Sequence, residues 1–240
     1  MQVTGNNNSP VKSLSILIYR GGLSFYDTTC NCLRKKDFPE HQRLSEQVIE
    51  GVESLVPEGT DSIRVIMAAS RYIMIPEELF DVSQNELYLQ ARSIPYDKEC
   101  DTIVLSTYNG VVFIMVLEAE MVDFLKNRFK EVSYIHPLLL SMIHYNKFRK
   151  DIYRPVLFVD HLEGQASVAL FDKNNMLFGE LLTADNNCDI LFYVKTVLEN
   201  YGITDAVIVA MGNHAENLYI LLRDYYNLLD TMPLNEYYVF

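Results

Sequence analysis

The chain has 240 residues, of which 49% are hydrophobic and 22% are charged, so it can bury one large core or two smaller lobes, and a globally disordered chain is excluded. Acidic residues outnumber basic ones by 32 to 20, which leaves few cations for a nucleic-acid-binding face, so we expect no nucleic acid partner. No uncharged apolar run is long enough to cross a membrane, and the polar N-terminus has no apolar signal core, so we expect a cytoplasmic protein without membrane insertion.

The first part of the chain predicts a strand hairpin, then a helix and a further strand. Two apolar runs of strand length stand on either side of Gly21-Gly22, a pattern typical of a hairpin. The expected elements are strands at 13–19 and 23–29, a helix at 39–56, a strand at 63–69 and two short helical pieces within 76–90. We assign residues 1–12 to a flexible N-terminus and residues 13–150 to a first lobe.

The middle of the chain predicts a second hairpin inside this lobe. Asn109-Gly110 separates two apolar runs, which is a strong signal for a two-residue type I′ turn. A helix with acidic residues in its first turn follows, and Pro137 favours the start of another helix. The expected elements are strands at 101–107 and 111–117, a helix at 118–130, a strand at 132–136 and a helix at 137–150.

The last part, residues 151–240, predicts a second lobe with the same order of elements as the first. The tail from Tyr237 to Phe240 is too apolar to be left in water, so we expect it to be buried. The expected elements are strands at 156–160, 165–171 and 176–183, a helix at 188–200, a strand at 206–211 and a helix at 214–226.

The two lobes lie at a constant sequence offset of 142 residues. This offset maps Gly22 to Gly164 and Val52 to Val194, and strand, turn, strand, helix and strand fall in register without gaps. We interpret the match as a duplication, with convergent strand–helix patterning as the alternative.

A repeated β-β-β-α-β unit with a glycine turn in its first hairpin resembles the ribonuclease H-like fold of the actin-like ATPases. The strand, Asn-Gly turn, strand, helix, strand and helix at 101–150 are similar to the extra subdomain of the type IV pilus-assembly and cell-division branch. The chain looks closest to an uncharacterised bacterial family described as actin-like ATPases, over residues 12–226. The resemblance implies a duplicated α/β fold, two β-β-β-α-β lobes with an inserted ββαβα section.

The resemblance also implies a phosphate-binding turn in the second lobe, where the family carries D-x-G-x-x-x-T/S. Asp160, Gly164 and Ser167 correspond to this motif, and Asp160 would be a weak Mg²⁺ ligand. Gly164 is displaced by two positions, and Leu162 stands where the first glycine belongs.

The other two expected nucleotide contacts also depart from the family motifs. The first-lobe turn keeps Arg20, Gly21 and Gly22, but the offset places Ile18 opposite Asp160, so the first acid is absent. The nucleoside turn of the family holds paired glycines, and this chain offers one, in Gly212-Asn213. Each of these residues also has a simpler interpretation, since the glycines can serve as tight turns and Asp160 as a turn acid.

We therefore expect a degenerate actin-like protein that works by binding, as a scaffold or regulatory partner of an unidentified protein. ATP with Mg²⁺ is a possible ligand but not the favoured one. The alternative is a weak ATPase or nucleotide sensor that uses the cleft between the lobes. A polymerising cytoskeletal protein is the third candidate, and the sequence predicts no oligomeric state.

The cysteines and histidines predict no further centre. Cys30-Asn31-Cys32 is a single C-x-C without a second pair at zinc-site spacing, and we interpret it as two small packed strand residues rather than part of a disulfide framework. On a strand the two thiols would share a face and could meet. His161 beside Asp160 would point to the opposite face of the strand. His136 and His144 lack metal-ligand spacing.

Overall fold

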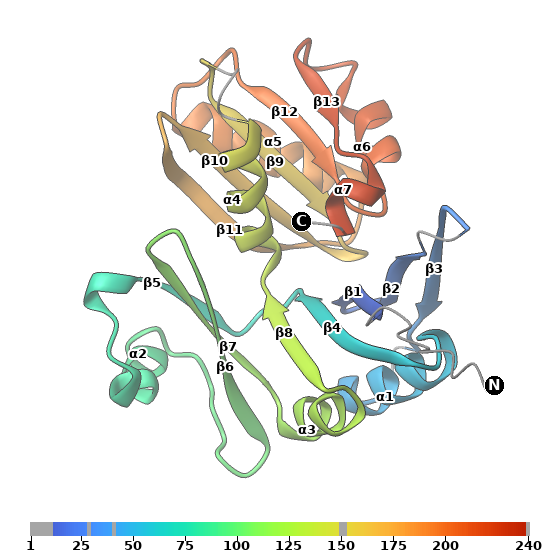
Figure 1. Ribbon diagram of the computed structural model, residues 1–240. Helices are drawn as coiled ribbons and strands as arrows, with labels where there is room; N and C mark the ends of the chain where they lie inside the picture. The colour runs from blue at the N-terminus through green and yellow to red at the C-terminus, as the bar shows by residue number, and fades with distance from the viewer. Residues whose placement is uncertain (1–11, 28–29, 40–41, 149–152, 239–240) are drawn as a thin grey trace, which may run out of the picture.

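The computed structural model describes residues 12–27, 30–39, 42–148 and 153–238. They form two lobes, each built on a five-stranded sheet, and a third, smaller sheet lies beside the first lobe (Figure 1). No helix in the described ranges is long and apolar enough to span a membrane.

The first sheet has the order β3-β2-β1-β4-β8, in which β1 is antiparallel to β2 and parallel to β4. Ile16 and Ile18 of β1 pack with helix α1, whereas Leu17 and Tyr19 pack toward the second lobe. Burial on both faces explains the continuous apolar run of this strand. The elements are β1 (Lys12–Tyr19), β2 (Gly22–Asp27), β3 (Cys32–Asp37), α1 (Leu44–Leu55), β4 (Thr60–Met67), α3 (Ala119–Arg128) and β8 (Glu131–Ile135).

The second sheet has the equivalent order, β11-β10-β9-β12-β13. In β9, Leu157 and Val159 pack against helix α5, and Val156 and Phe158 face the first lobe. Because successive side chains alternate, Asp160 also points toward the first lobe. The elements are β9 (Val156–His161), β10 (Gly164–Asp172), β11 (Asn175–Ala184), α5 (Asn187–Asn200), β12 (Val207–Met211), α6 (Ala215–Leu222), β13 (Leu229–Thr231) and α7 (Leu234–Tyr238).

The small sheet has the order β5-β7-β6. Its hairpin turns at Asn109 and Gly110, with φ of 49° and 78°, which confirms the predicted type I′ turn. Helix α2 packs on one face of the sheet, and α3 packs with β7 on the other. The elements are β5 (Tyr72–Pro76), which was not predicted, two 3₁₀ turns (Glu77–Leu79 and Val82–Gln84), α2 (Asn85–Ala91), β6 (Asp101–Tyr108) and β7 (Val111–Glu118).

Residues 101–150 do not form one inserted unit. Strand β8 belongs to the first five-stranded sheet, and helix α4 (Pro137–Phe148) crosses to pack against β10 and β11 of the second lobe. Leu138, Leu139 and Leu140 are successive residues and all are buried. A helix with apolar side chains around its circumference must be covered on several sides, and the space between the lobes provides that cover.

The two lobes share one strand order, but the constant offset of 142 is wrong in detail. Tyr19 pairs with Gly22 around one turn, and Leu162 donates its N–H to Gln165 around the other. These two-residue turns therefore match at an offset of 143, which places Leu17 opposite Asp160. Since Leu17 is as apolar as Ile18, the first lobe still lacks the acid. The duplication itself stays a prediction.

The interpretation of Cys30 and Cys32 as unbonded strand residues is wrong. The two sulfur atoms form a disulfide in the turn between β2 and β3. Asp27 pairs with Cys32 at the last position of the ladder, so Cys30 lies in the turn rather than on a strand. The turn, with Asn31 at φ 53°, brings the two Cα atoms within 5.4 Å, a separation that a disulfide can bridge.

Two helices are shorter than expected. Helix α1 begins at Leu44 rather than near residue 39, because Arg43 is extended, and the Gln47 amide donates to the carbonyls of Pro39 and Gln42. Helix α6 covers 215–222 of the predicted 214–226. The predictions for residues 1–11, 28–29, 149–152 and 239–240 lie outside the described residues.

Candidate functional site

Asp160 is the next-to-last residue of β9, and its carboxyl group is fully buried between the lobes. Its Oδ2 accepts a 2.6 Å hydrogen bond from the Tyr237 hydroxyl, and Oδ1 has no hydrogen-bond partner among the described residues. Burial raises the pKa of Asp160 to about 7, although the hydrogen bond from Tyr237 favours the charged form. A buried carboxyl group with a single donor is costly to ionise, and such groups concentrate at functional sites.

Gly212 follows β12 and lies directly against this carboxyl group. Its φ is +78°, and a Cβ at this position would lie 2.2 Å from Oδ1 of Asp160. Both the backbone conformation and the contact therefore require glycine. The remaining glycine of the predicted nucleoside turn thus packs onto the predicted metal ligand.

Two tyrosines of the C-terminal helix α7 lie between the lobes at this point. Tyr237 and Tyr238 are 0% and 2% exposed. The Tyr238 hydroxyl donates to Oδ1 of Asn213 at 2.8 Å, Nδ2 of Asn213 donates to Oγ of Ser24 at 2.8 Å, and Ser24 Oγ lies 3.0 Å from the Tyr238 hydroxyl. If Ser24 donates the last bond, each hydroxyl accepts one hydrogen bond and donates one. The ring ties β2 of the first lobe to the turn after β12.

The two glycine-bearing turns face each other across the same interface. Glu163 and Gly164 form the second turn, with φ of 46° and 84°. A Cβ on Gly21 would lie 3.1 Å from the Glu163 side chain, and one on Gly22 would lie 2.6 Å from a backbone carbonyl oxygen of β3. Arg20 is exposed, with its Cδ 3.9 Å from the Cβ position of Gly164.

Glu163 connects this turn to both lobes. Its Oε1 accepts a 3.0 Å hydrogen bond from Nε2 of His214 and lies 3.7 Å from Nζ of Lys35 in β3. The ring of His161 lies 5.2 Å from that of His214, and burial lowers the pKa of His161. The structure therefore places His161 beside His214, and the Asp160 carboxyl group bonds to Tyr237.

The second-lobe motif residues are buried as well. Ser167 pairs with Asp160 across the two strands, is 1% exposed, and its Oγ has no hydrogen-bond partner within the described chain. Leu162 packs in the hydrophobic cluster between the lobes. The predicted nucleotide residues thus lie along one interface. Asp160, Ser167 and Gly212 are packed against the chain itself, whereas Arg20, Gly21 and Gly164 line a cavity.

This arrangement does not fit a bound Mg²⁺–nucleotide. Mg²⁺ demands a near-octahedral shell of oxygen atoms and usually keeps several waters, whereas one oxygen of Asp160 is hydrogen-bonded to Tyr237 and the other lies against Gly212. A phosphate group needs open backbone N–H groups. The Gly21 turn instead faces the carboxylate of Glu163, which would repel it.

A cavity of about 810 Å³ lies beside this interface. It is lined by both turns, the end of β4, the junction of β7 with α3, and the segment that precedes α1. Its wall carries apolar groups such as Met67 and Ala68 and charged groups such as Glu118 and Arg71. The Arg71 guanidinium is held by two bonds of 2.6 and 2.7 Å to the Asp101 carboxylate.

Sequence reasoning missed Tyr237, Tyr238, Ser24 and Glu163 as members of the site. The apolar tail indicated that the two tyrosines are buried, but not where. Glu163 directly precedes Gly164 in the sequence, and its charge beside a predicted phosphate-binding glycine could have indicated that it belongs to the site. Nothing in the sequence distinguished Ser24 from the other small residues of its strand.

Two solved structures share the fold of this chain. The first is a Bacteroides thetaiotaomicron protein with actin-like ATPase fold and unknown function, with a TM-score of 0.72 and 16% identity over 96% of this chain and 94% of that chain. The second is the PilM–PilN type IV pilus biogenesis complex, with a TM-score of 0.59 and 13% identity over 95% and 90%. These similarities confirm the predicted actin-like ATPase fold.

No curated protein matches the sequence at a significant level. One family profile matches residues 3–228, nearly the whole chain, under the description "Protein of unknown function (DUF3822)". The chain therefore belongs to the DUF3822 family, an uncharacterised family with the actin-like ATPase fold.

Proposed function

We propose that this chain is a degenerate actin-like protein that acts by binding, as a scaffold or regulatory partner, and not by hydrolysing ATP. The observation that carries the proposal is the pair of C-terminal tyrosines between the lobes. The Tyr237 hydroxyl donates a hydrogen bond to the Asp160 carboxyl group, the group that would hold a metal ion. Tyr238 joins the two lobes through its hydrogen bonds with Ser24 and Asn213. Opening the site would break these bonds and expose two buried aromatic rings, which is costly.

One structural neighbour supports partner binding by this fold. PilM forms a complex with PilN in type IV pilus biogenesis. We propose that the 810 Å³ cavity of this chain accepts a segment of its protein partner. The cavity is lined by both apolar and charged residues, and its volume falls within the range of about 300–1,000 Å³ that is common for binding sites.

A nucleotide thermal-shift experiment tests the first part of the proposal. A ligand at about 100 times its Kd adds about 2.7 kcal/mol of stability, which raises the Tm of a chain of this size by about 5–10 °C. We expect no shift with ATP, ADP or GTP, with or without Mg²⁺. A Mg²⁺-dependent shift that Asp160→Asn abolishes would contradict the proposal.

Copurification from the native source tests the second part. Ser70 lines the cavity and is exposed, so Ser70→Trp should occupy the cavity without disturbing the core. The matched control is Ser133→Trp, which places the same side chain at an exposed position of β8. We expect a protein that copurifies with the wild type and the control to be lost from Ser70→Trp. Equal recovery with all three chains would exclude the cavity as the docking site.

The alternative, a weak ATPase or nucleotide sensor, is favoured by one observation. Asp160 and Gly212 still converge, and the tyrosine that covers the Asp160 carboxyl group comes from the last helix of the described chain. A partner that withdraws this helix would expose this carboxyl group. The decisive comparison is phosphate release by the wild type and by Asp160→Ala in matched preparations. An Asp160-dependent rate at ordinary enzyme levels, with kcat about 1 s⁻¹ or more, would favour the ATPase.

A further inference from the structure

The disulfide between Cys30 and Cys32 has no evident structural purpose. The stabilisation that a cross-link gives an unfolded chain grows with the length of the loop that it closes, and this one encloses only three residues. The ends of β2 and β3 are already held together by the antiparallel ladder, in which Asp27 pairs with Cys32. The bond therefore adds little to the stability of a hairpin that forms without it.

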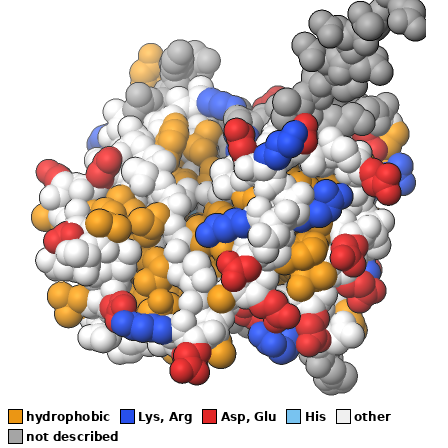
Figure 2. Space-filling model, turned by 60° about the horizontal axis from the view of Figure 1, so that its bottom comes forward, with side chains coloured by type: hydrophobic (Ala, Val, Ile, Leu, Met, Phe, Trp, Pro, Cys, Tyr) orange, Lys and Arg blue, Asp and Glu red, His pale blue; other side chains and the backbone are white. Residues whose placement is uncertain are grey.

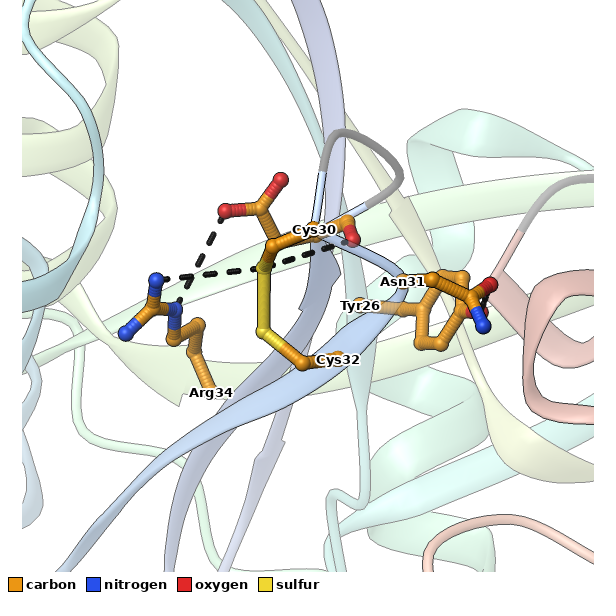
Figure 3. Close-up of a disulfide and its surroundings, with 6 residues drawn as sticks. Tyr26, Cys30, Asn31, Cys32 and Arg34 are labelled. Atoms are coloured by element: carbon orange, nitrogen blue, oxygen red, sulfur yellow. Dashed lines mark hydrogen bonds and ion pairs between the residues drawn. A yellow bond between two sulfur atoms is a disulfide. The ribbon is translucent and has the colours of Figure 1, made fainter.

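The position of the pair instead favours chemistry at sulfur. Cys30 is exposed and Cys32 is half-buried, at the tip of the β2–β3 hairpin (Figure 3). Thiol–disulfide exchange requires a thiolate to reach a sulfur atom, so an exposed disulfide is open to it. Disulfides that are accessible in this way are commonly the labile, regulatory or catalytic ones.

A positively charged side chain, Arg34, lies beside one of the two sulfur atoms. Nη2 of Arg34 lies 3.8 Å from Sγ of Cys30, and Nε of Arg34 lies 3.9 Å from Oδ2 of Asp27. Figure 3 shows the guanidinium group turned toward the disulfide, while Asn31 points the other way and accepts a hydrogen bond from the Tyr26 hydroxyl. Because a nearby cation stabilises a thiolate, we assign the first attack to the reduced Cys30. The Asp27 carboxylate, within 4.8 Å of both sulfur atoms, opposes this effect, and Arg34 lies close to both groups.

From this geometry we propose that Cys30 and Cys32 form a thiol–disulfide exchange site, whose substrates are disulfides with an exposed sulfur atom. The Cys30 thiolate attacks a substrate disulfide, forms a mixed disulfide and releases one substrate thiolate. The Cys32 thiolate then attacks Sγ of Cys30 and releases the second. The two cysteines are oxidised by two electrons, the substrate is reduced to two thiols, and the protons of the cysteines pass to the released thiolates. An incoming dithiol returns the site to its reduced form by the reverse steps.

Oxidised glutathione is the probe for this reaction, and intact-chain mass after alkylation is the readout. We expect two thiols, Cys100 and Cys188, to react in the oxidised chain and four after reduction, because these two are the free cysteines of the structure. The chain in which Cys100 and Cys188 are changed to serine should regain the Cys30–Cys32 bond after reduction without keeping a glutathione adduct; this background, which is also used for Cys32→Ser, is needed because the two exposed thiols would form adducts of their own. Cys32→Ser should stop at the mixed disulfide on Cys30, since the second attacking thiol is gone.

The role of Arg34 is tested on Cys30 as the sole cysteine, with the other three changed to serine. We expect Arg34→Gln to slow alkylation of Cys30 at pH 7 about threefold, less than the tenfold that one full pKa unit would give, because Arg34 is largely exposed to solvent. High salt should reduce the difference. Arg154→Gln, which removes an exposed charge elsewhere, is the matched control and should leave the rate unchanged.

Three results would overturn the proposal. The first is a Cys100→Ser, Cys188→Ser chain that keeps both remaining thiols reactive, or keeps a stable glutathione adduct, after the oxidant. The second is an alkylation rate that does not change in Arg34→Gln. The third is a reduced chain that binds one Zn²⁺ and resists glutathione until a chelator is added. Asp27, Cys30 and Cys32 place their ligand atoms within 4.8 Å of one another, so this last result would assign the turn to a metal ion instead.

Discussion

Replacement of Asp160 by asparagine should stabilise the protein at pH 8 and have little effect at low pH. Burial raises the pKa of the native carboxyl group to about 7, against an ordinary value of 3.8. The native state therefore binds more protons than the unfolded state between these two values. The stability contributed by Asp160 is fully present below pH 3.8 and is lost as the pH rises through about 7.

The size of the effect follows from the shift. One pKa unit corresponds to about 1.4 kcal/mol, so a shift of roughly three units lowers the free energy of unfolding by up to about 4 kcal/mol between acid and pH 8. Asparagine has nearly the same shape, can accept the hydrogen bond from Tyr237 and cannot ionise. The difference in unfolding free energy between Asp160→Asn and wild type should therefore grow by up to about 4 kcal/mol over this range and level off above it.

Urea unfolding of both chains between pH 4 and pH 8 measures this difference. Asp205→Asn is the control, because Asp205 is exposed and its replacement should give a flat profile. Tyr237→Phe removes the one hydrogen bond that lowers the pKa of Asp160, so its pH profile should move to higher pH. A difference that does not change with pH, or an asparagine variant that is less stable at pH 8, would refute the reasoning.

The remaining predictions use the same unfolding assay. Gly212→Ala should cost more than about 2 kcal/mol, because a positive φ and a 2.2 Å overlap with the buried carboxyl group act together, whereas Gly59→Ala has a similar φ and open space around it and should cost about 1 kcal/mol. Burial lowers the pKa of His136 to about 4, so stability should fall by up to about 3 kcal/mol as the pH drops from 6.5 to 4, and His136→Gln should remove this fall. Tyr238→Phe should cost about 1–3 kcal/mol because the hydrogen-bonded ring between the lobes opens, and Arg71→Lys should cost about 1 kcal/mol because lysine cannot form the two parallel bonds to a carboxylate. These predictions would be contradicted if the two alanine variants lost equal amounts of stability, or if the loss of stability at acid pH persisted in His136→Gln. Unchanged stability of Tyr238→Phe or Arg71→Lys would contradict the predictions for those two residues.

The surface of the protein carries charged side chains of both signs as well as hydrophobic patches (Figure 2), a mixture that is relevant to partner binding. On the face shown in Figure 2, Lys and Arg side chains lie among Asp and Glu side chains, and hydrophobic side chains gather in patches between them. The lining of the cavity has the same mixture, with Glu118 and Arg71 among apolar residues such as Met67 and Ala68. A partner segment with both charged and apolar side chains would match it.

The sequence by itself determined the local elements of this protein. The apolar run at 13–19 predicted the strand β1, and Asn109-Gly110 predicted a type I′ turn, because these features depend on residues within one turn or strand. The order of the elements also sufficed for the fold class. The short elements β5, β13 and α7 escaped prediction, since segments of three to five residues carry too short a pattern.

The tertiary structure alone decided the state of the candidate site. Tyr237 reaches Asp160 across 77 positions of the chain, and Ser24 meets Tyr238 across 214. Helix α4 packs on the second lobe although it follows a strand of the first. Local periodicity holds no information on such pairs, because they depend on how each lobe lies against the other. The sequence therefore singled out Asp160 and Gly212 one by one, and only the packing decided that they contact each other and that Tyr237 covers the carboxyl group.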